Sequence, residues 1–188
     1  MSKTLLIIIS GPPCTGKTTL ARKIAREIRL PLISKDDIKE SLFDSLGIKD
    51  REWSKKIGKA SYKILYQLIE SLLQAKQSLI VESNFKPEFE NKRFLDLQKK
   101  CDFDSLQIMC KTNGEILFER FKKRSESKKR HPGHFDDQNY DKFKEILLKG
   151  KHNPLNLRGK VFDVDTTDFK KIDHNSILRI IKSSAKSI

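Results

Sequence analysis

Residues 4–28 read TLLIIISGPPCTGKTTLARKIAREI, and they carry the strongest fold signal in the chain. Its apolar start, LLIII, is short and rich in β-branched residues, which is typical of a buried parallel strand. Gly11, four further residues, Gly16, Lys17 and Thr18 then give the G-x-x-x-x-G-K-[ST] spacing of a phosphate-binding loop, the Walker A motif. After the loop, apolar residues recur four apart, which predicts a helix. The strand before and the helix after are the context that this motif requires.

The residue types of the loop suit a triphosphate. Glycine lacks a Cβ, so the backbone can approach a phosphate closely and turn its N–H groups inward at the start of a helix. Lys17 is expected to reach the β and γ phosphates, and the Thr18 hydroxyl to ligate Mg²⁺. The sequence therefore predicts ATP and Mg²⁺ as cofactors. For Cys14, inside the loop, a small filler residue is the favoured interpretation and a reactive thiol is the alternative. The predicted nucleotide-binding residues are Gly11, Pro12, Pro13, Cys14, Thr15, Gly16, Lys17, Thr18 and Thr19.

Length and composition limit the class of protein. A chain of 188 residues predicts one domain spanning 1–188. No apolar run approaches 18 residues, so no transmembrane helix is expected, and the first residues show no secretory signal pattern. The three cysteines are widely spaced and odd in number, which does not fit a disulfide framework or a zinc site. We therefore expect a cytoplasmic protein that has no disulfide partner and does not act at a membrane.

The chain is strongly basic, with a net charge of +14. The segment RFKKRSESKKR, residues 120–130, carries seven cations and one acid. Such a balance favours an anionic ligand or nucleic acid as partner. The alternative is that many of the lysines are solvated surface, because a charge run alone is weak support for a binding site.

Predicted strands and helices alternate along the chain. Short apolar runs predict the strands, and three- to four-residue periodicity predicts the helices. This alternation predicts an α/β fold, a parallel sheet with helices on both faces. Strands are predicted at 5–9, 30–34, 78–83, 106–111 and 160–166, and helices from 18, at 37–46, 55–75, 87–100, 113–124 with an Asn113 cap, 139–150 and 174–182.

Two large classes of phosphate-loop protein do not fit. A GTPase needs an N-K-x-D guanine motif, and the only Asn-Lys pair continues to Phe94 where aspartate is required. A motor ATPase usually has a strand ending in Asp-Glu, whereas the strand near residue 80 ends in Glu82 and Ser83. Both departures favour a small kinase.

Three further segments, SKDDIKE (34–40), VESN (81–84) and ERFKKR (119–124), together resemble the phosphate-loop kinases of the polynucleotide kinase, zeta toxin and chloramphenicol phosphotransferase group. The first is similar to the R-D-D-x-x-R segment of polynucleotide kinases, with Lys39 aligned to the later arginine. A lysine there loses the bidentate fork of arginine, which implies a different substrate. The resemblance covers roughly residues 4–125.

The other two segments carry the rest of the resemblance. Glu82-Ser83-Asn84 is similar to the family's D-x-N strand end, and Arg120 and Arg124 to its two lid arginines. The segment RHPGH at 130–134 lies outside the polynucleotide kinase pattern and looks more like uncharacterised ATP-binding members of the group. The resemblance implies a five-stranded sheet in the order 2-3-1-4-5 and a lid near 120–137.

Asp36 is the predicted catalytic carboxylate. It follows the second strand, at the edge where open α/β sheets place ligands, and can accept a proton from an acceptor hydroxyl or position that hydroxyl. The alternative is that Asp36 only caps the following helix. Asp37 is assigned to the favourable charge at that helix start.

The remaining candidates divide between phosphate, metal and acceptor. Arg120 and Arg124 lie four apart and can face one side of a helix, to stabilise the transferring phosphoryl group or to stack on adenine; the alternative is a basic helix end. Glu82 either holds a magnesium-bound water or fixes a basic side chain. A zinc site near the two histidines of RHPGH lacks Cys or His partners at ligand spacing. The predicted acceptor-binding residues are Lys39, Asn84, Arg130 and His131, with His134 also able to touch phosphate or substrate.

These patterns predict a Mg-ATP-dependent kinase that uses Lys17, Asp36, Arg120 and Arg124 to phosphorylate a hydroxyl group of a small molecule. A polynucleotide 5′-hydroxyl kinase is the second possibility, supported by the basic charge. An ATP-binding regulatory or toxin-like protein with little turnover is the third.

Overall fold

The computed structural model describes residues 4–127, 130–135 and 140–186. Five parallel strands form one sheet in the order β2-β3-β1-β4-β5, which confirms the predicted fold and strand order. The strands are β1 (Thr4–Ser10), β2 (Leu32–Ser34), β3 (Leu79–Glu82), β4 (Phe103–Lys111) and β5 (Gly159–Asp165). The helices are α1 (Lys17–Ile28), α2 (Lys35–Leu46), α3 (Arg51–Gln74), α4 (Pro87–Cys101), α5 (Gly114–Glu126), α6 (Tyr140–Leu148) and α7 (His174–Lys186), with short 3₁₀ turns η1 (Pro132–His134) and η3 (Phe169–Lys171).

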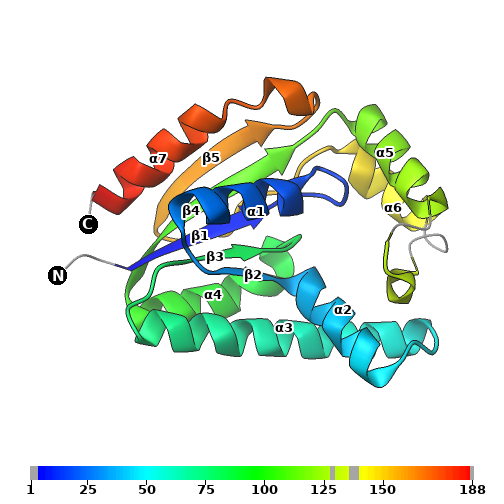
Figure 1. The fold of residues 1–188 in the computed structure, drawn as a ribbon, viewed down its shortest axis with the longest axis horizontal. Coiled ribbons are helices and arrows are strands. Elements are labelled where there is room, and N and C mark those ends of the chain that lie inside the picture. Colours follow the sequence, from blue (N-terminus) through cyan, green and yellow to red (C-terminus); the bar gives the residue numbers. More distant parts are fainter. Residues whose placement is uncertain (1–3, 128–129, 136–139, 187–188) are drawn as a thin grey trace.

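The central strand is buried on both faces, as its continuous apolar sequence predicts. Leu6 and Ile8 belong to a core cluster with residues of α3 and α4, whereas Ile7 and Ile9 belong to one with residues of α1 and α7. Alternate residues of a strand point to opposite faces, so one strand supplies both cores. Figure 1 shows the resulting three layers, with α1 and α7 on one face and α3 and α4 on the other.

Helices α5 and α6 lie at the carboxyl end of the sheet, beyond the ends of β1 and β4 (Figure 1). They pack on each other through Leu117, Phe121 and Leu147, which are fully buried. Asn113 caps α5 as predicted, since its side chain accepts from the backbone N–H groups of Glu115 and Ile116. The predicted lid at 120–137 thus begins inside a helix; its residues 128–129 and 136–137 lie outside the described part of the chain.

Candidate active site

The loop between β1 and α1 has the backbone that phosphate binding needs. Gly16 has φ of 79° and Cys14 has φ of 66°, both in the left-handed region, so the chain wraps into a concave turn at the start of α1. A Cβ at Gly16 would lie 2.6 Å from the Phe169 ring, so this position requires glycine for space as well as for φ. The Thr15 hydroxyl donates to the Pro12 carbonyl at 3.0 Å and is fully buried, which fixes the turn from inside.

Lys17 and Thr18 meet the end of β3 at the floor of the site. The Lys17 ammonium lies 3.9 Å from the Glu82 carboxylate and 3.4 Å from the Pro12 carbonyl oxygen. Ser34 Oγ donates to Glu82 Oε2 at 2.8 Å, and the Thr18 side chain also hydrogen-bonds Glu82. Burial raises the pKa of Glu82, and the Lys17 charge and these hydroxyl groups oppose the increase.

This floor fits a magnesium ion that keeps most of its ligands as water and phosphate. Mg²⁺ in phosphate-transfer sites is commonly bound through one or two protein oxygens, and the Thr18 hydroxyl and the Glu82 carboxylate lie together here. Among residues 4–127, 130–135 and 140–186, no group of three or more His, Cys, Asp and Glu side chains could form a protein-only metal cage. The donor set therefore suits Mg²⁺ held together with a nucleotide.

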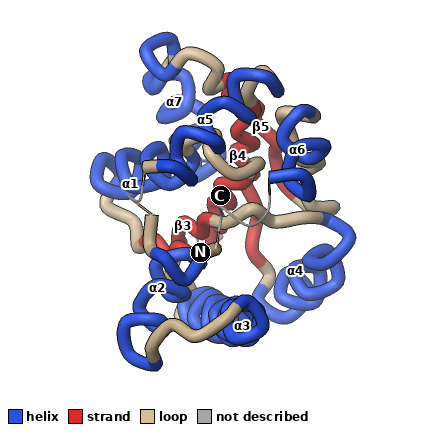
Figure 2. Tube along the Cα trace, turned by 90° about the vertical axis from the view of Figure 1, so that its right-hand side faces the viewer, coloured by secondary structure: helices blue, strands red, loops and turns tan. Residues whose placement is uncertain are grey.

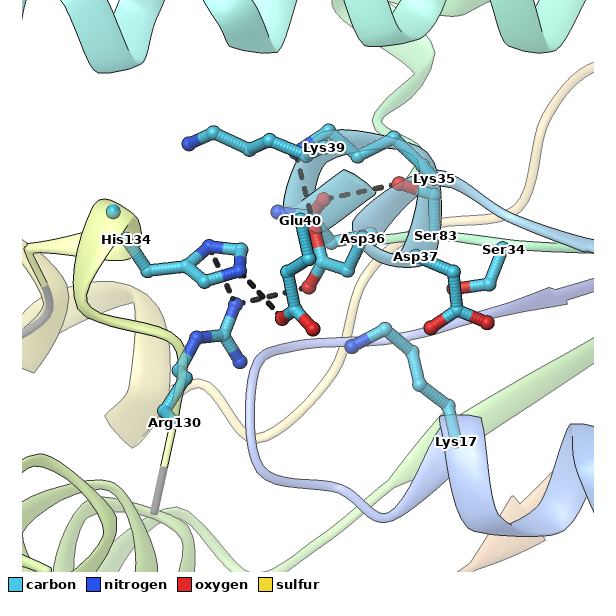
Figure 3. Close-up of polar contacts among 12 residues, drawn as sticks. Lys17, Ser34, Lys35, Asp36, Asp37, Lys39, Glu40, Ser83, Arg130 and His134 are labelled. Carbon is cyan, nitrogen blue, oxygen red and sulfur yellow. Dashed lines mark hydrogen bonds and ion pairs between the residues drawn. The ribbon is translucent and has the colours of Figure 1, made fainter. Parts of the chain in front are cut away.

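Asp36 faces the phosphate loop, in the first turn of α2. Its carboxylate accepts from Lys35 at 3.1 Å and from Arg130 at 2.9 Å, and a cavity of about 340 Å³ joins it to Lys17 and Thr18. Burial alone would raise the pKa of Asp36, but Lys35, Arg130 and other neighbouring charges hold it well below its usual range. Figure 3 shows the Lys17 side chain pointing toward the turn of α2 that carries Asp36.

Asp37 has a different environment. Its side chain is about half exposed, and it pairs with Arg22 of α1 at 2.8 Å. Ser34 stands at the N-cap of α2, so neither aspartate is the capping residue. The two adjacent acids therefore have different surroundings. Asp36 lines the cavity, whereas Asp37 links α2 to α1 at the surface.

Arg120 is clamped to the loop that follows β5. Its two terminal nitrogens donate to the carbonyl oxygens of Thr166 and Thr167 at 2.8 and 2.7 Å, and its guanidinium lies 4.0 Å from the centre of the Phe169 ring. Arg124, one turn later on α5, also lines the cavity. The cavity wall thus combines a stacked arginine and phenylalanine with a second arginine.

The segment RHPGH docks on α2 and α3 and brings Arg130 to the site. The Gly133 carbonyl accepts from Ser54 Oγ at 2.7 Å, and the buried Gly133 backbone lies against the Phe43 ring, where a Cβ would be 2.5 Å away. His131 stacks on Phe43 and contacts Asp44 at 3.1 Å. His131 does not line the 340 Å³ cavity, whereas Arg130 does.

His134 links Arg130 to Glu40. Its Nδ1 lies 3.0 Å from an Arg130 nitrogen and its Nε2 lies 2.8 Å from Glu40 Oε1 (Figure 3). Arginine can only donate, so Nδ1 accepts and the ring proton sits on Nε2, donating to the carboxylate. Burial and the Arg130 charge lower the pKa of His134 to about 3, so the ring is neutral near pH 7. The pair is a neutral imidazole donating to Glu40, not an ion pair.

Two predicted acceptor residues lie beside the cavity, not in its wall. Lys39 is buried, and its amine donates to Ser54 Oγ at 2.9 Å. Asn84 Oδ1 lies 3.5 Å from the Tyr62 hydroxyl at the end of β3. The alignment of Lys39 with the later family arginine also needs correction, because Glu40 stands at that position when counted from Asp36.

Sequence reasoning missed three residues that shape the site. Phe169 forms a wall of the cavity from a 3₁₀ turn that no apolar periodicity marks. Lys35 and Ser34 hold the two carboxylates at the strand ends. Their only sequence signal is their position just before Asp36, at the end of a short strand and immediately after it.

Comparisons with known proteins identify the family of this chain. A family model described as "AAA domain" matches residues 6–147 of this chain. The chain belongs to this AAA domain family. The chain is 41% identical in sequence to a "putative kinase" from Chloroflexus aurantiacus whose crystal structure is known. The two structures match over 97% of this chain and 98% of the other, with a TM-score of 0.90. The resemblance to phosphate-loop kinases is thereby confirmed.

Two further matches are either short or low in sequence identity. A cytidylate kinase from Pyrobaculum islandicum is 43% identical over 51 residues, and the match spans 27% of this AAA domain chain and 28% of that enzyme. A gluconokinase from Sinorhizobium meliloti is 12% identical, with a TM-score of 0.54 over 98% of this chain and 95% of the other, and supports the fold alone. Within the part of the chain that the structure describes, no helix combines the length and the apolar character needed to cross a membrane.

Proposed function

We propose that this protein is a Mg-ATP-dependent kinase that transfers the γ-phosphate to a hydroxyl group of a small molecule. The observation that carries the proposal is the single cavity that joins Lys17 and Thr18 of the phosphate loop to the Asp36 carboxylate. A nucleotide-binding loop alone serves many functions. A carboxylate facing it across a space lined by arginines suits the reaction class of phosphoryl transfer.

Different residues bind the phosphates, Mg²⁺ and the adenine ring. Backbone N–H groups of the loop and the Lys17 ammonium bind the β and γ phosphates. Thr18 and, through water, Glu82 would hold Mg²⁺, which supplies charge neutralisation on the phosphates. Arg120 has its nitrogens occupied by two carbonyl groups and its face on Phe169, so this pair is suited to stack on the adenine ring.

Asp36 positions the acceptor hydroxyl. Its carboxylate accepts the hydroxyl hydrogen and directs the oxygen lone pair at the γ-phosphorus. Because neighbouring cations keep its pKa well below the usual range, Asp36 is a weak base. In a loose transition state the proton leaves late, so orientation rather than early proton removal is the main contribution. Arg124 and Arg130 then offset charge on the transferring group.

The docked segment 130–134 favours a small acceptor. Arg130 bonds Asp36, and Gly133 packs on α2 and α3, so the approach to the carboxylate is covered from one side. A metabolite fits under such a cover more easily than a nucleic-acid chain. The net charge of +14 is the observation that keeps a polynucleotide 5′-hydroxyl acceptor as the second candidate.

One experiment separates these functions. The protein is incubated with Mg²⁺ and γ-labelled ATP, and with a pool of hydroxylated metabolites and 5′-hydroxyl oligonucleotides in parallel. We expect label in a small-molecule product, and loss of it in D36N. Label only in oligonucleotides supports the second candidate. Tight ATP binding without transfer to either pool contradicts the kinase proposal and supports a regulatory ATP-binding protein.

A further inference from the structure

A second cavity lies away from the phosphate loop, between the start of α4 and the segment that follows α6. It has a volume of about 390 Å³, and its wall includes Lys86, Lys149, Lys151, His152 and Glu88. Figure 2 shows α4 and α6 on the same side of the molecule, with a loop running between them. No residue with a role in the proposed reaction lines this cavity.

The protein only partly offsets the positive charge in this cavity. The wall contains three lysines and one glutamate. No described residue forms a hydrogen bond or ion pair with the amines of Lys86, Lys149 or Lys151. In the phosphate-loop cavity, by contrast, Arg130 donates to the Asp36 carboxylate and Arg120 to the Thr166 carbonyl oxygen. A cavity with several uncompensated amines favours an anion.

His152 adds a specific donor and acceptor. Both of its ring nitrogens are buried, and neither has a hydrogen-bond partner among the described residues. Buried polar atoms are rarely left without partners, and an exception calls for a ligand or water. Burial and the charges of Lys86 and Lys17 lower the pKa of His152 to about 4, with Glu88 acting in the opposite sense. The neutral ring offers one N–H to an anion.

The cavity is close along the chain to the floor of the phosphate-loop site, although none of the described residues lines both cavities. Lys86, in the wall of this cavity, follows Glu82, at the floor of the phosphate loop, by four residues, so this part of the wall lies near the carboxyl end of β3. The Lys17 charge also helps to lower the pKa of His152. The nucleotide phosphates are already served by the loop itself.

We propose that this basic cavity binds a carboxylate or phosphate group of the acceptor, so that the substrate is a hydroxylated acid and not a neutral alcohol. The identity of the ligand rests on the proposed kinase function, whereas the anion site itself does not. Lys86 and Lys151 supply charge, and His152 donates a hydrogen bond that fixes the orientation of the acidic group.

Imidazole NMR on protein saturated with ADP and Mg²⁺ tests the site without any turnover. ADP occupies the phosphate loop, so added anions report on the second cavity. The His152 resonance is assigned with H152Q, and gluconate, glucose and inorganic phosphate are added separately. We expect gluconate and phosphate, but not glucose, to shift this resonance saturably and to raise the pKa of His152.

Variants and kinetics complete the test. K86A and K151A are each expected to weaken gluconate binding by about tenfold, as for a lost charged hydrogen bond. K92A, an exposed lysine of α4 outside the cavity wall, is the matched control and should bind normally. Transfer is then compared for matched acceptors with and without an acidic group, and we expect the acidic member to have the higher kcat/KM.

The outcomes separate the two proposals. Anion binding at His152 with no transfer to any acceptor retains the site and rejects the kinase function. Transfer that is equal for acidic and neutral acceptors, or a His152 resonance that no anion shifts, overturns the inference while leaving kinase function intact. Phosphate that binds at His152 without competing with the acceptor also overturns it, because the site would then serve a separate anion.

Discussion

Replacement of Asp36 by asparagine is the sharpest test of the proposed mechanism. The substitution keeps the size of the side chain and an oxygen acceptor but removes the charge that pairs with Lys35 at 3.1 Å and Arg130 at 2.9 Å. Transfer to the acceptor should fall, because the hydroxyl loses its strongest hydrogen-bond acceptor. ATP affinity should stay the same or increase, since a negative charge is removed near the triphosphate.

The magnitude follows from the environment of the carboxylate. Removal of a general base usually costs about 10²–10⁴-fold in rate. The pKa of Asp36 is held well below its usual range, so its value as a base is small and the loss should lie near 10²-fold. A lowered pKa also means that Asp36 stays ionised at every pH above its ordinary value near 4. The wild-type rate should therefore show no inflection from Asp36 between pH 5 and 8.

The assay is acceptor phosphorylation at saturating ATP, with ATP affinity measured separately by calorimetry. Asp37→Asn is the matched control, because that neighbouring acid is about half exposed and pairs with Arg22 outside the cavity. Its surface ion pair contributes about 0.2–1 kcal/mol to stability at most, and transfer should be nearly unchanged. A larger loss of transfer in D37N than in D36N would refute the assignment of the two acids.

Three further predictions follow from the same site. Lys17→Ala should strongly weaken ATP binding without unfolding the protein, and unchanged ATP affinity by calorimetry would contradict the phosphate-loop assignment. Arg124→Ala should lower turnover on the order of 10³-fold with a small effect on ATP affinity. Arg120→Ala should mainly weaken ATP binding. If both variants keep wild-type kinetics, the two arginines serve only as a basic helix end. The pKa of His134 is about 3 in the folded protein, against an ordinary value of 6.5. The neutral ring therefore contributes stability that is fully present above pH 6.5 and is lost as pH falls toward 3. In denaturant unfolding, the wild type should lose up to about 2 kcal/mol of stability between about pH 7 and pH 5 that H134Q retains. Equal pH dependence of the two proteins would contradict that assignment.

The phosphate loop and the order of the secondary structure follow from the amino-acid sequence alone. The glycine spacing and the buried strand before it are local features, since each depends on φ and on hydrophobic pattern within about twenty residues. Within the described residues, the strands and the α-helices were predicted within a few residues of their observed bounds. The α3 helix began four residues earlier than its periodicity indicated, because the Asp50 side chain caps it by accepting from the Trp53 N–H.

The tertiary structure decided which side chains share a cavity. Arg130 and Asp36 are 94 residues apart in the chain, and Arg120 reaches carbonyl groups 46 and 47 residues away. Lys39 and Asp36 lie within one turn of the same helix, yet Lys39 bonds Ser54 of α3 and Asp36 enters the cavity. Residues three apart lie only about 60° apart around a helix, so spacing alone would put both side chains on one side, and the neighbours decide between them: α3 takes Lys39 through Ser54, and Arg130 meets Asp36. Sequence spacing carries the chemistry of each group, whereas long-range packing assigns its direction and its charged neighbours.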